Sequence, residues 1–195
     1  MKYSEAILHS VSNAVLAVAD RPVAVGVDGQ GGSGKSTFAG ELAGILPITS
    51  RIVQGDDFYS DIPAGEKALL GPGEGYEGFF DWRRLNSEVL ASIRDRASVL
   101  HYQQYDWDSE ALGEWFELSM PEVVIVEGIY TLRPELRDAF DVTVFIQASA
   151  ETRVKRQTSR AENSRFWIEQ WMAAEEFYVA NKGPWEWVDF VVDGE

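Results

Sequence analysis

The sequence predicts an α/β fold in which helices cover both faces of a doubly wound, mainly parallel sheet of about five strands. Three observations support this prediction. Short β-branched runs alternate with longer segments in which apolar residues recur at helical spacing. A glycine-rich loop joins the first of these runs to a helical pattern. The 195 residues, 45% of them apolar, suit one domain over 1–195.

The first part of the chain predicts helix, strand, helix and strand in that order. Apolar residues recur at helical spacing over 4–18, and PVAVGV at Pro22–Val27 has the length of a buried strand. A second helical pattern covers Ser36–Leu46 and ends at Pro47, because proline lacks an amide donor. RIVQG at Arg51–Gly55 predicts the second strand.

The rest of the chain continues the alternation after a long connection. Five glycines and one proline predict a mobile loop over 64–78, and helical spacing predicts a helix over Trp82–Arg96. Further helices are expected at Glu135–Phe140 and at Glu151–Val179, the second with a break near Asn163. The three remaining strands are predicted at Val123–Val126, Val142–Ile146 and Phe190–Val192.

Composition excludes several classes of protein. The net charge of −15 argues against a nucleic-acid-binding protein, because binding to the phosphate backbone needs a broad basic face. The chain has no cysteine, which excludes disulfides and a thiol nucleophile and is compatible with a reducing cytoplasm. The two histidines form no zinc or hydrolase motif. The apolar stretch over 4–18 is too polar and too short to span a membrane.

The loop GQGGSGKS at Gly29–Ser36 fits the pattern GxxxxGK[ST] of a phosphate-binding loop. Its glycines let backbone amides turn toward an anion, and the following helix adds its positive end. Lys35 can reach the β- and γ-phosphates, and Ser36 can hold Mg²⁺. We therefore expect ATP and Mg²⁺ as cofactors. The predicted nucleotide-binding residues are Gly29, Gly31, Gly32, Ser33, Gly34, Lys35, Ser36 and Thr37.

Other motifs separate the classes of nucleotide-binding enzymes that use such a loop. A GTPase needs an NKxD motif, whereas NKGP at 181–184 has a proline in place of the aspartate. Motor ATPases usually end the strand at Val123–Val126 with two acidic residues, but here Glu127 is followed by Gly128. These differences favour a small-molecule kinase.

The motifs as a set resemble the uridine kinase group of P-loop kinases, which includes the nicotinamide riboside kinases and lies near pantothenate kinase and phosphoribulokinase. The resemblance spans most of the chain. GDDFY and an arginine-bearing segment are the motifs that distinguish this kinase group from other P-loop proteins. The motifs are GQGGSGKST, GDDFY at Gly55–Tyr59, FDW at Phe80–Trp82, YDW at Tyr105–Trp107, VVIVEG at Val123–Gly128 and the segment Thr152–Arg165.

The resemblance implies roles for three acidic residues. Asp56 matches the catalytic base, and its neighbour Asp57 would point the other way if the strand continued. The alternative is that the two aspartates only cap a turn. Glu127 matches the acidic residue that binds Mg²⁺, directly or through water, so the predicted metal site comprises Ser36, Glu127 and Asp56.

The resemblance also implies an acceptor-site insertion at about 56–118. Asp81 matches a residue that accepts hydrogen bonds from ribose hydroxyls, and Tyr59 and Tyr105 match aromatic residues of the same pocket. For these three residues, helix capping and loop packing are the alternative roles.

A basic segment with a local charge of +3 is expected to form a lid at about 151–168. The resemblance makes Arg160 and Arg165 catalytic lid residues, and we assign Arg156 to substrate binding. Gln157 stands where nucleoside kinases often carry another arginine. The alternative is a solvated helix face.

The sequence departs from uridine kinases in the acceptor region, because it lacks their His-Pro pair and the histidine that helps recognise the pyrimidine. The expected activity is transfer of the γ-phosphate of ATP to a hydroxyl of a nucleoside-like small molecule. Kinases of pantothenate, glycerate or a sugar remain alternatives, as does a nucleotide-binding regulatory protein without turnover. The sequence leaves open the acceptor, the choice between ATP and GTP, and whether the chain forms a homo-oligomer.

Overall fold

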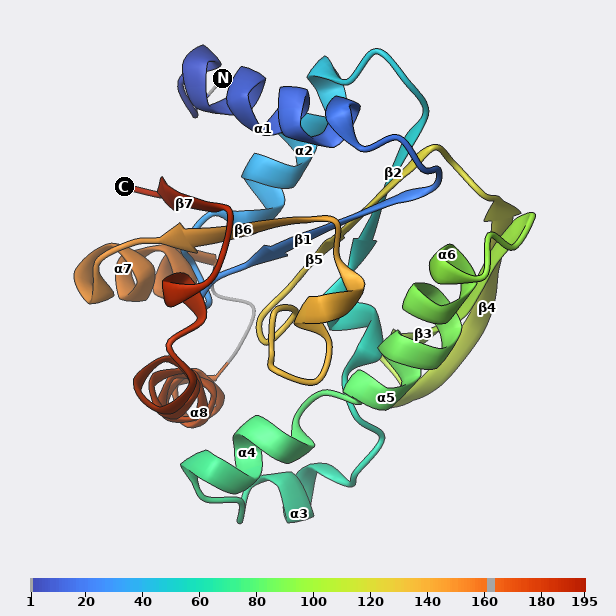
Figure 1. Cartoon of the computed structure of the whole chain (residues 1–195). Coiled ribbons are helices and arrows are strands. Elements are labelled where there is room, and N and C mark those ends of the chain that lie inside the picture. Colours follow the sequence, from blue (N-terminus) through green and yellow to red (C-terminus); the bar gives the residue numbers. More distant parts are fainter. Residues whose placement is uncertain (1, 161–163) are drawn as a thin grey trace.

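The sheet of this protein has five parallel strands in the order β2-β5-β1-β6-β7. The computed structural model describes residues 2–160 and 164–195, except for the side chain of Arg160. The strands are β1 (Val23–Asp28), β2 (Ser50–Gln54), β5 (Val123–Glu127), β6 (Val142–Gln147) and β7 (Phe190–Asp193). The predicted α/β fold with a parallel sheet is confirmed (Figure 1).

Alternation along β1 divides the core into two layers. Val23, Val25 and Val27 pack against α1 (Glu5–Ala17) and α2 (Lys35–Ile45). Ala24, between them, packs on the opposite face against the helix and strands of the segment that follows β2. Successive side chains of a strand point to opposite faces, so helices cover both sides of the sheet as predicted.

The other helical segments lie after β2 and after β6. They are α3 (Ala64–Lys67), α4 (Pro72–Gly78), α5 (Trp82–Arg84), a π-helical turn (Leu85–Leu90), α6 (Ala91–Arg94), α7 (Ala150–Arg160) and α8 (Arg165–Lys182). The helix predicted over Trp82–Arg96 is confirmed, with its π-helical middle as a local difference. The predicted break near Asn163 falls on residues outside those described, between the end of α7 and the start of α8.

The segment 64–78 is not the mobile loop that its glycines predict, because it contains α3 and α4. Glu74 accepts a hydrogen bond from the amide of Gly71 at 2.9 Å and so caps α4, and Pro72 occupies its first turn. The buried ring of Tyr76 stacks on Tyr178 of α8 at a centroid distance of 5.4 Å. Packing on α8 therefore outweighs the low helix propensity of glycine.

A hairpin that the sequence analysis did not predict lies inside the expected acceptor-site insertion. Strands β3 (Val99–Asp106) and β4 (Ala111–Ser119) pair in antiparallel fashion. Leu100 and Tyr102 point into the core, whereas Val99 and His101 are exposed. This alternation over four residues is the signal that could have predicted β3.

The helix predicted at Glu135–Phe140 is wrong, because only a 3-10 turn at Arg137–Ala139 forms there. The buried guanidinium of Arg133 binds Glu135 at 2.8 Å and Glu77 at 2.9 Å. The pair with Arg133 holds the carboxylate of Glu135 at the start of the predicted helix, and the chain continues there in turns instead of an α-helix.

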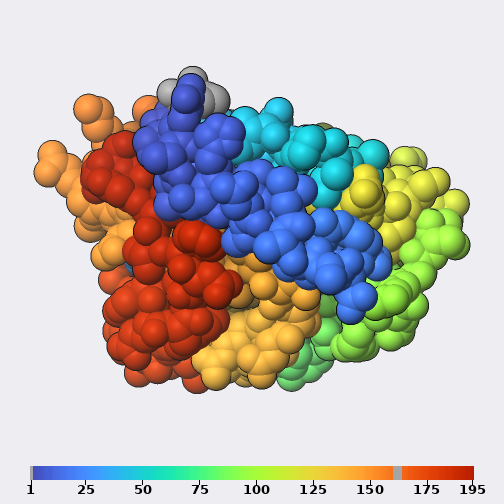
Figure 2. All heavy atoms as spheres, turned by 45° about the horizontal axis from the view of Figure 1, so that its top comes forward, coloured from blue at the N-terminus to red at the C-terminus, as the bar shows by residue number. Residues whose placement is uncertain are grey.

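The two ends of the described chain lie side by side. The Lys2 ammonium donates to the Gly194 carbonyl at 2.8 Å, and Figure 2 shows the N-terminal segment in blue against the C-terminal segment in red. Two further 3-10 turns, at Gly55–Phe58 and Pro184–Glu186, complete the described elements. No helix in the described part of the chain is both long and apolar enough to cross a membrane.

Candidate active site

The glycine-rich loop lies between the end of β1 and the start of α2, at the carboxyl edge of the sheet. Gly32 and Gly34 have φ angles of 78° and 111°, which favour glycine, and Gly34 is the N-cap of α2. A Cβ atom at Gly32 would come within 2.7 Å of the Arg153 carbonyl oxygen. The loop therefore needs its glycines, and its amides together with the helix end form an anion-binding site.

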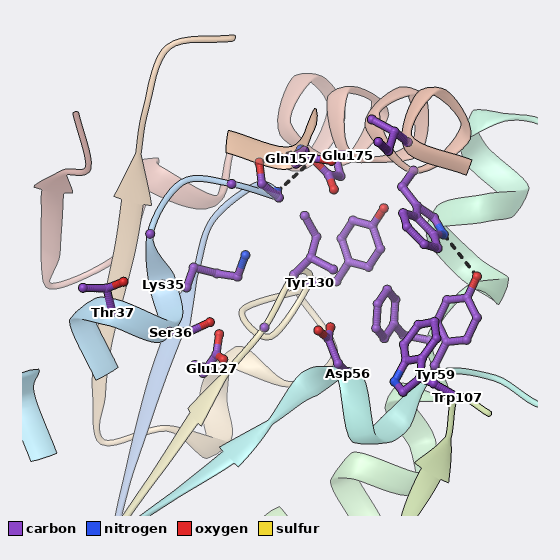
Figure 3. Close-up of a pocket in the computed structure, with 18 residues that line it drawn as sticks. Lys35, Ser36, Thr37, Asp56, Tyr59, Trp107, Glu127, Tyr130, Gln157 and Glu175 are labelled. Atoms are coloured by element: carbon purple, nitrogen blue, oxygen red, sulfur yellow. Dashed lines mark hydrogen bonds between the residues drawn. The ribbon is translucent and has the colours of Figure 1, made fainter. Parts of the chain in front are cut away.

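A cavity of about 470 Å³ opens beside this loop (Figure 3). From the loop and α2 it is lined by Gly31, Gly32, Gly34, Lys35, Ser36 and Thr37. Of the other predicted loop residues, Gly29 and Ser33 lie outside the lining, and Ser33 is fully buried. The Lys35 ammonium lies 3.3 Å from the Gln30 carbonyl oxygen, to which it donates.

Asp56 lines the cavity and Asp57 does not. Both belong to the 3-10 turn Gly55–Phe58 that follows β2. Their side chains therefore point in different directions because of this turn, and not because of the alternation expected for a strand. Asp57 accepts a hydrogen bond from the Gln104 side-chain amide at 3.2 Å, and burial raises the pKa of its carboxyl. Figure 3 shows Asp56 pointing toward the centre of the cavity. The geometry thus leaves Asp56 as the aspartate of this pair that can meet a ligand there.

The carboxylate of Glu127 faces the cavity from the end of β5. It is 6% exposed, and burial raises its pKa against the opposing influence of Lys35 and of a hydrogen bond with Ser36. The nearby carboxyl of Asp56 also raises this pKa. The carboxylates of Asp56 and Glu127 and the hydroxyl of Ser36 are hard oxygen donors on one cavity. A divalent cation would relieve the repulsion between the two carboxylates. The donor set therefore fits Mg²⁺, which usually binds one or two carboxylates together with phosphates.

Aromatic rings form the wall of the cavity beside Asp56. Tyr59 stacks on Trp107 at a centroid distance of 4.7 Å, and its hydroxyl accepts a hydrogen bond from the Trp171 indole at 3.1 Å. Phe80 meets Tyr59 edge-on at 5.2 Å. All four rings line the cavity, and we call them the aromatic wall.

A buried lysine supports this wall from behind. The Lys67 ammonium lies 3.9 Å from the centroid of the Tyr59 ring, and it donates to the Ser60 carbonyl. Burial lowers its pKa to about 8. Tyr105 also lies behind the wall, edge-on to Tyr59 at 5.3 Å and to Trp107 at 5.1 Å, and is not part of the lining. The wall is thus held in place from the side away from the cavity.

Besides Tyr105, two other predicted substrate-binding residues do not line the cavity. Asp81 is the N-cap of α5 and accepts from the Arg84 amide at 3.1 Å, which is the capping role named above as the alternative. Arg156 donates to the carbonyl oxygens of Gly32 at 3.0 Å and Gly194 at 2.7 Å, on the outer side of the loop. Neither lines the cavity.

The predicted lid arginines also lie away from the cavity lining where the structure describes them. The Arg165 side chain is 92% exposed and pairs with Glu169 at 2.7 Å. Arg160 is the last residue of α7, and its side chain lies outside the described part of the chain.

Two buried acidic residues were missed from the sequence, one at the base of the phosphate loop and one that lines the cavity. Asp28, at the end of β1, accepts hydrogen bonds from the amide of Leu132 at 2.8 Å and from the Tyr178 hydroxyl at 2.7 Å. Glu175 of α8 lines the cavity and is 5% exposed. The signal for Asp28 was an acidic residue ending an apolar strand, and the signal for Glu175 was a charge next to Ala174 on the apolar face of a helix.

Comparison with known proteins identifies the family. No family model matches the sequence. A uridine kinase from Ureaplasma urealyticum is 30% identical to this chain over 154 residues, which cover 75% of the chain and 72% of the relative. The chain belongs to the uridine kinase-like P-loop kinases. This kinase is therefore a phosphotransferase that acts on a hydroxyl group, and its relatives support ATP as the phosphate donor.

Solved structures show the same fold as this kinase over nearly its whole length. A protein from Bacillus stearothermophilus described as a possible uridine kinase has a TM-score of 0.71 at 22% identity, covering 95% of this chain and 97% of its own. A D-glycerate 3-kinase from Cryptococcus neoformans has a TM-score of 0.63 at 17% identity, covering 98% and 97%. The fold is thus shared by kinases named for different acceptors.

Proposed function

We propose that this kinase transfers the γ-phosphate of ATP to a primary hydroxyl of a nucleoside-like acceptor, with Mg²⁺ as cofactor. One observation carries the proposal: the aromatic wall and Asp56 lie on the same cavity as the phosphate loop. A flat ring of the acceptor can pack against the exposed part of the wall, where Trp107 is 47% exposed. A hydroxyl of the same molecule would then lie between Asp56 and the phosphates.

The proposed reaction uses three groups of this chain. The Asp56 carboxylate takes the proton of the acceptor hydroxyl as its oxygen bonds to the γ-phosphorus, and the bond from that phosphorus to the leaving ADP oxygen breaks. Lys35 and the loop amides stabilise negative charge on the phosphates. Mg²⁺, held near Ser36 and Glu127, would neutralise further phosphate charge.

The charges of the cavity favour a neutral acceptor over glycerate or pantothenate. Among the described lining residues Lys35 is the only cation, and it belongs to the phosphate loop, whereas Asp56, Glu127 and Glu175 are acidic. A carboxylate on the acceptor would lie near these acidic groups without a basic partner. A nucleoside carries no such charge.

Two parts of the chain outside the phosphate loop have proposed supporting roles. We assign the segment 56–118 to the acceptor side, because it supplies Tyr59, Phe80 and Trp107. We also propose that Arg165 is a lid residue that contacts the phosphates. To reach the phosphates it would have to leave its exposed pair with Glu169, which costs little.

The experiment that tests the proposal is identification of the phosphorylated product. Purified kinase, MgATP and a single nucleoside are incubated, and the product is analysed by mass spectrometry and phosphorus NMR. A nucleoside 5′-phosphate formed together with equimolar ADP supports the proposal. Nucleotide binding without any acceptor-dependent ADP, across nucleosides and other metabolites, would instead support a regulatory protein without turnover.

A further inference from the structure

A carboxylate of the chain itself occupies a backbone donor of the phosphate loop. Glu175 Oε2 of α8 accepts a hydrogen bond from the Gly31 amide at 3.0 Å. The side chain is buried, and Figure 3 shows it reaching into the cavity opposite Lys35. The amides of such a loop are the groups that cradle nucleotide phosphates. Glu175 therefore stands where an anionic ligand would bind.

Several charged and titratable groups face Glu175 from the surrounding elements. Arg153 of α7, which is itself buried, lies 3.6 Å from Glu175 Oε2. The same guanidinium binds Glu176 more closely, at 2.7 Å, so it is shared between two carboxylates. Lys35 of α2 favours the charged form of Glu175, and Tyr130, after β5, lies within electrostatic reach.

Burial outweighs the neighbouring cations and raises the pKa of Glu175 to about 7. The carboxyl is thus close to half ionised at neutral pH. Its ionised form makes the strongest hydrogen bond to the Gly31 amide, and its neutral form makes a weaker one.

A nucleotide phosphate and an ionised Glu175 cannot both use the Gly31 site. One amide has a single hydrogen to donate, and two anions held at the same donor repel each other in a buried setting. Gln157, whose side-chain amide donates to the Gly31 carbonyl at 2.8 Å, holds the loop in the conformation that presents this amide. With Glu175 buried in place, the nucleotide should therefore bind most tightly when this carboxyl is neutral.

We propose that Glu175 is an internal competitor at the nucleotide site, which binds the Gly31 amide in the empty enzyme and competes there with the phosphates of the incoming nucleotide. The inference rests on the proposed function, because it takes this cavity as the ATP site. It goes beyond that function by making donor affinity depend on an acidic residue of α8.

The test compares nucleotide binding by the wild-type enzyme, Glu175→Gln and Glu176→Gln. Glu176→Gln removes a charge from the same helix and leaves the Glu175 carboxyl in place, but Glu176 shares Arg153 with Glu175, so its loss should favour the ionised form of Glu175. Isothermal calorimetry with MgADP is run from pH 6 to pH 8, and thermal unfolding confirms that each variant is folded.

The wild type should bind MgADP about tenfold more weakly at pH 8 than at pH 6, because a group titrating near pH 7 is then about nine-tenths ionised. Glu175→Gln should bind with nearly equal affinity at both pH values. Glu176→Gln should keep a pH dependence, with its midpoint at a lower pH than in the wild type, because a negative charge that raises the pKa of Glu175 is gone. Equal pH profiles for wild type and Glu175→Gln would overturn the proposal. So would weaker binding by Glu175→Gln throughout, which would make Glu175 a supporting residue.

A second measurement needs no variant. Binding of MgADP to the wild type at pH 7.5 should take up protons, so the observed enthalpy should change with the ionisation enthalpy of the buffer. No proton uptake would overturn the inference even if Glu175→Gln fails to fold. Failure of the wild type to bind MgADP at all would instead overturn the proposed function, so the two failures are distinguishable.

Discussion

The two halves of the cavity are formed by different kinds of structure. The phosphate half consists of consecutive residues of one loop and the first turn of α2, where backbone conformation does most of the positioning. The acceptor half consists of four rings from separate segments of the chain. They are Tyr59 after β2, Phe80 after α4, Trp107 after β3 and Trp171 near the start of α8. One half depends on local geometry and the other on tertiary packing.

This difference has a consequence for mutation. A loop that presents amides and one ammonium has no substitute for either, so a change there should remove a whole interaction. A wall of rings shares its contact area among several side chains, so losing one should lower affinity in part. Effects should therefore be large on the phosphate side and graded on the acceptor side.

The largest effect is expected for Lys35→Ala. Lys35 is the sole cation among the described lining residues, so its loss should lower kcat by about 10³-fold and weaken MgATP binding. Steady-state kinetics and calorimetry measure the two effects. Lys155→Ala, an exposed lysine on α7, is the control. Normal affinity and rate in Lys35→Ala would show that the loop is not the donor site.

The next effect is expected for Asp56→Asn, at about 10²-fold or more in kcat, because an amide cannot take the proton of the acceptor hydroxyl. MgATP affinity should stay near the wild-type value. Asp57→Asn is the matched control, since Asp57 points away from the cavity and contacts Gln104. A larger loss in Asp57→Asn than in Asp56→Asn would reverse the assignment of the base.

Arg165→Ala should lower kcat by roughly tenfold to a hundredfold, because the proposed lid arginine acts on the transferring phosphate. Thermal stability should change little, because Arg165 is exposed and its pair with Glu169 is a surface ion pair. Glu169→Gln, which breaks the same pair, controls for the ion pair. Unchanged kcat in Arg165→Ala would leave the arginine as part of a solvated helix face.

The smallest effect is expected for Trp107→Ala, with about a fivefold to tenfold rise in the acceptor KM. The KM for ATP should hardly change, because the ring lies on the acceptor side. Trp115→Ala provides a matched control: this tryptophan is 53% exposed, on β4, and stacks on His101 instead of lining the cavity. Equal effects of the two substitutions would argue against a role for the wall in acceptor binding.

The local half of the site could be predicted from the sequence almost in full. The glycines and Lys35 form one short pattern, and the strand before it and the helix after it follow from apolar spacing. Asp56 and Glu127 could be placed because both directly follow predicted strands, whose carboxyl ends meet at one edge of a parallel sheet.

The assembled half could not be predicted, because its members depend on packing between distant segments. Trp171 reaches the cavity only because α8 packs on α4, and the hairpin that carries Trp107 was not recognised. The roles of Asp81 and Arg156 depend on nearby backbone groups, an amide in one case and carbonyl oxygens in the other. A residue type alone does not reveal which of these partners it will meet.

The most direct test of the account is ADP formation measured across a panel of single acceptors, namely nucleosides, nicotinamide riboside, pantothenate, glycerate and sugars, with Asp56→Asn run in parallel. We predict rapid ADP release with a neutral or cationic acceptor that combines a flat ring with a primary hydroxyl, and a loss of about 10²-fold in the Asp56→Asn reaction. Rapid release with glycerate or pantothenate, and none with any nucleoside, would contradict the central claim that the aromatic wall selects a nucleoside-like acceptor.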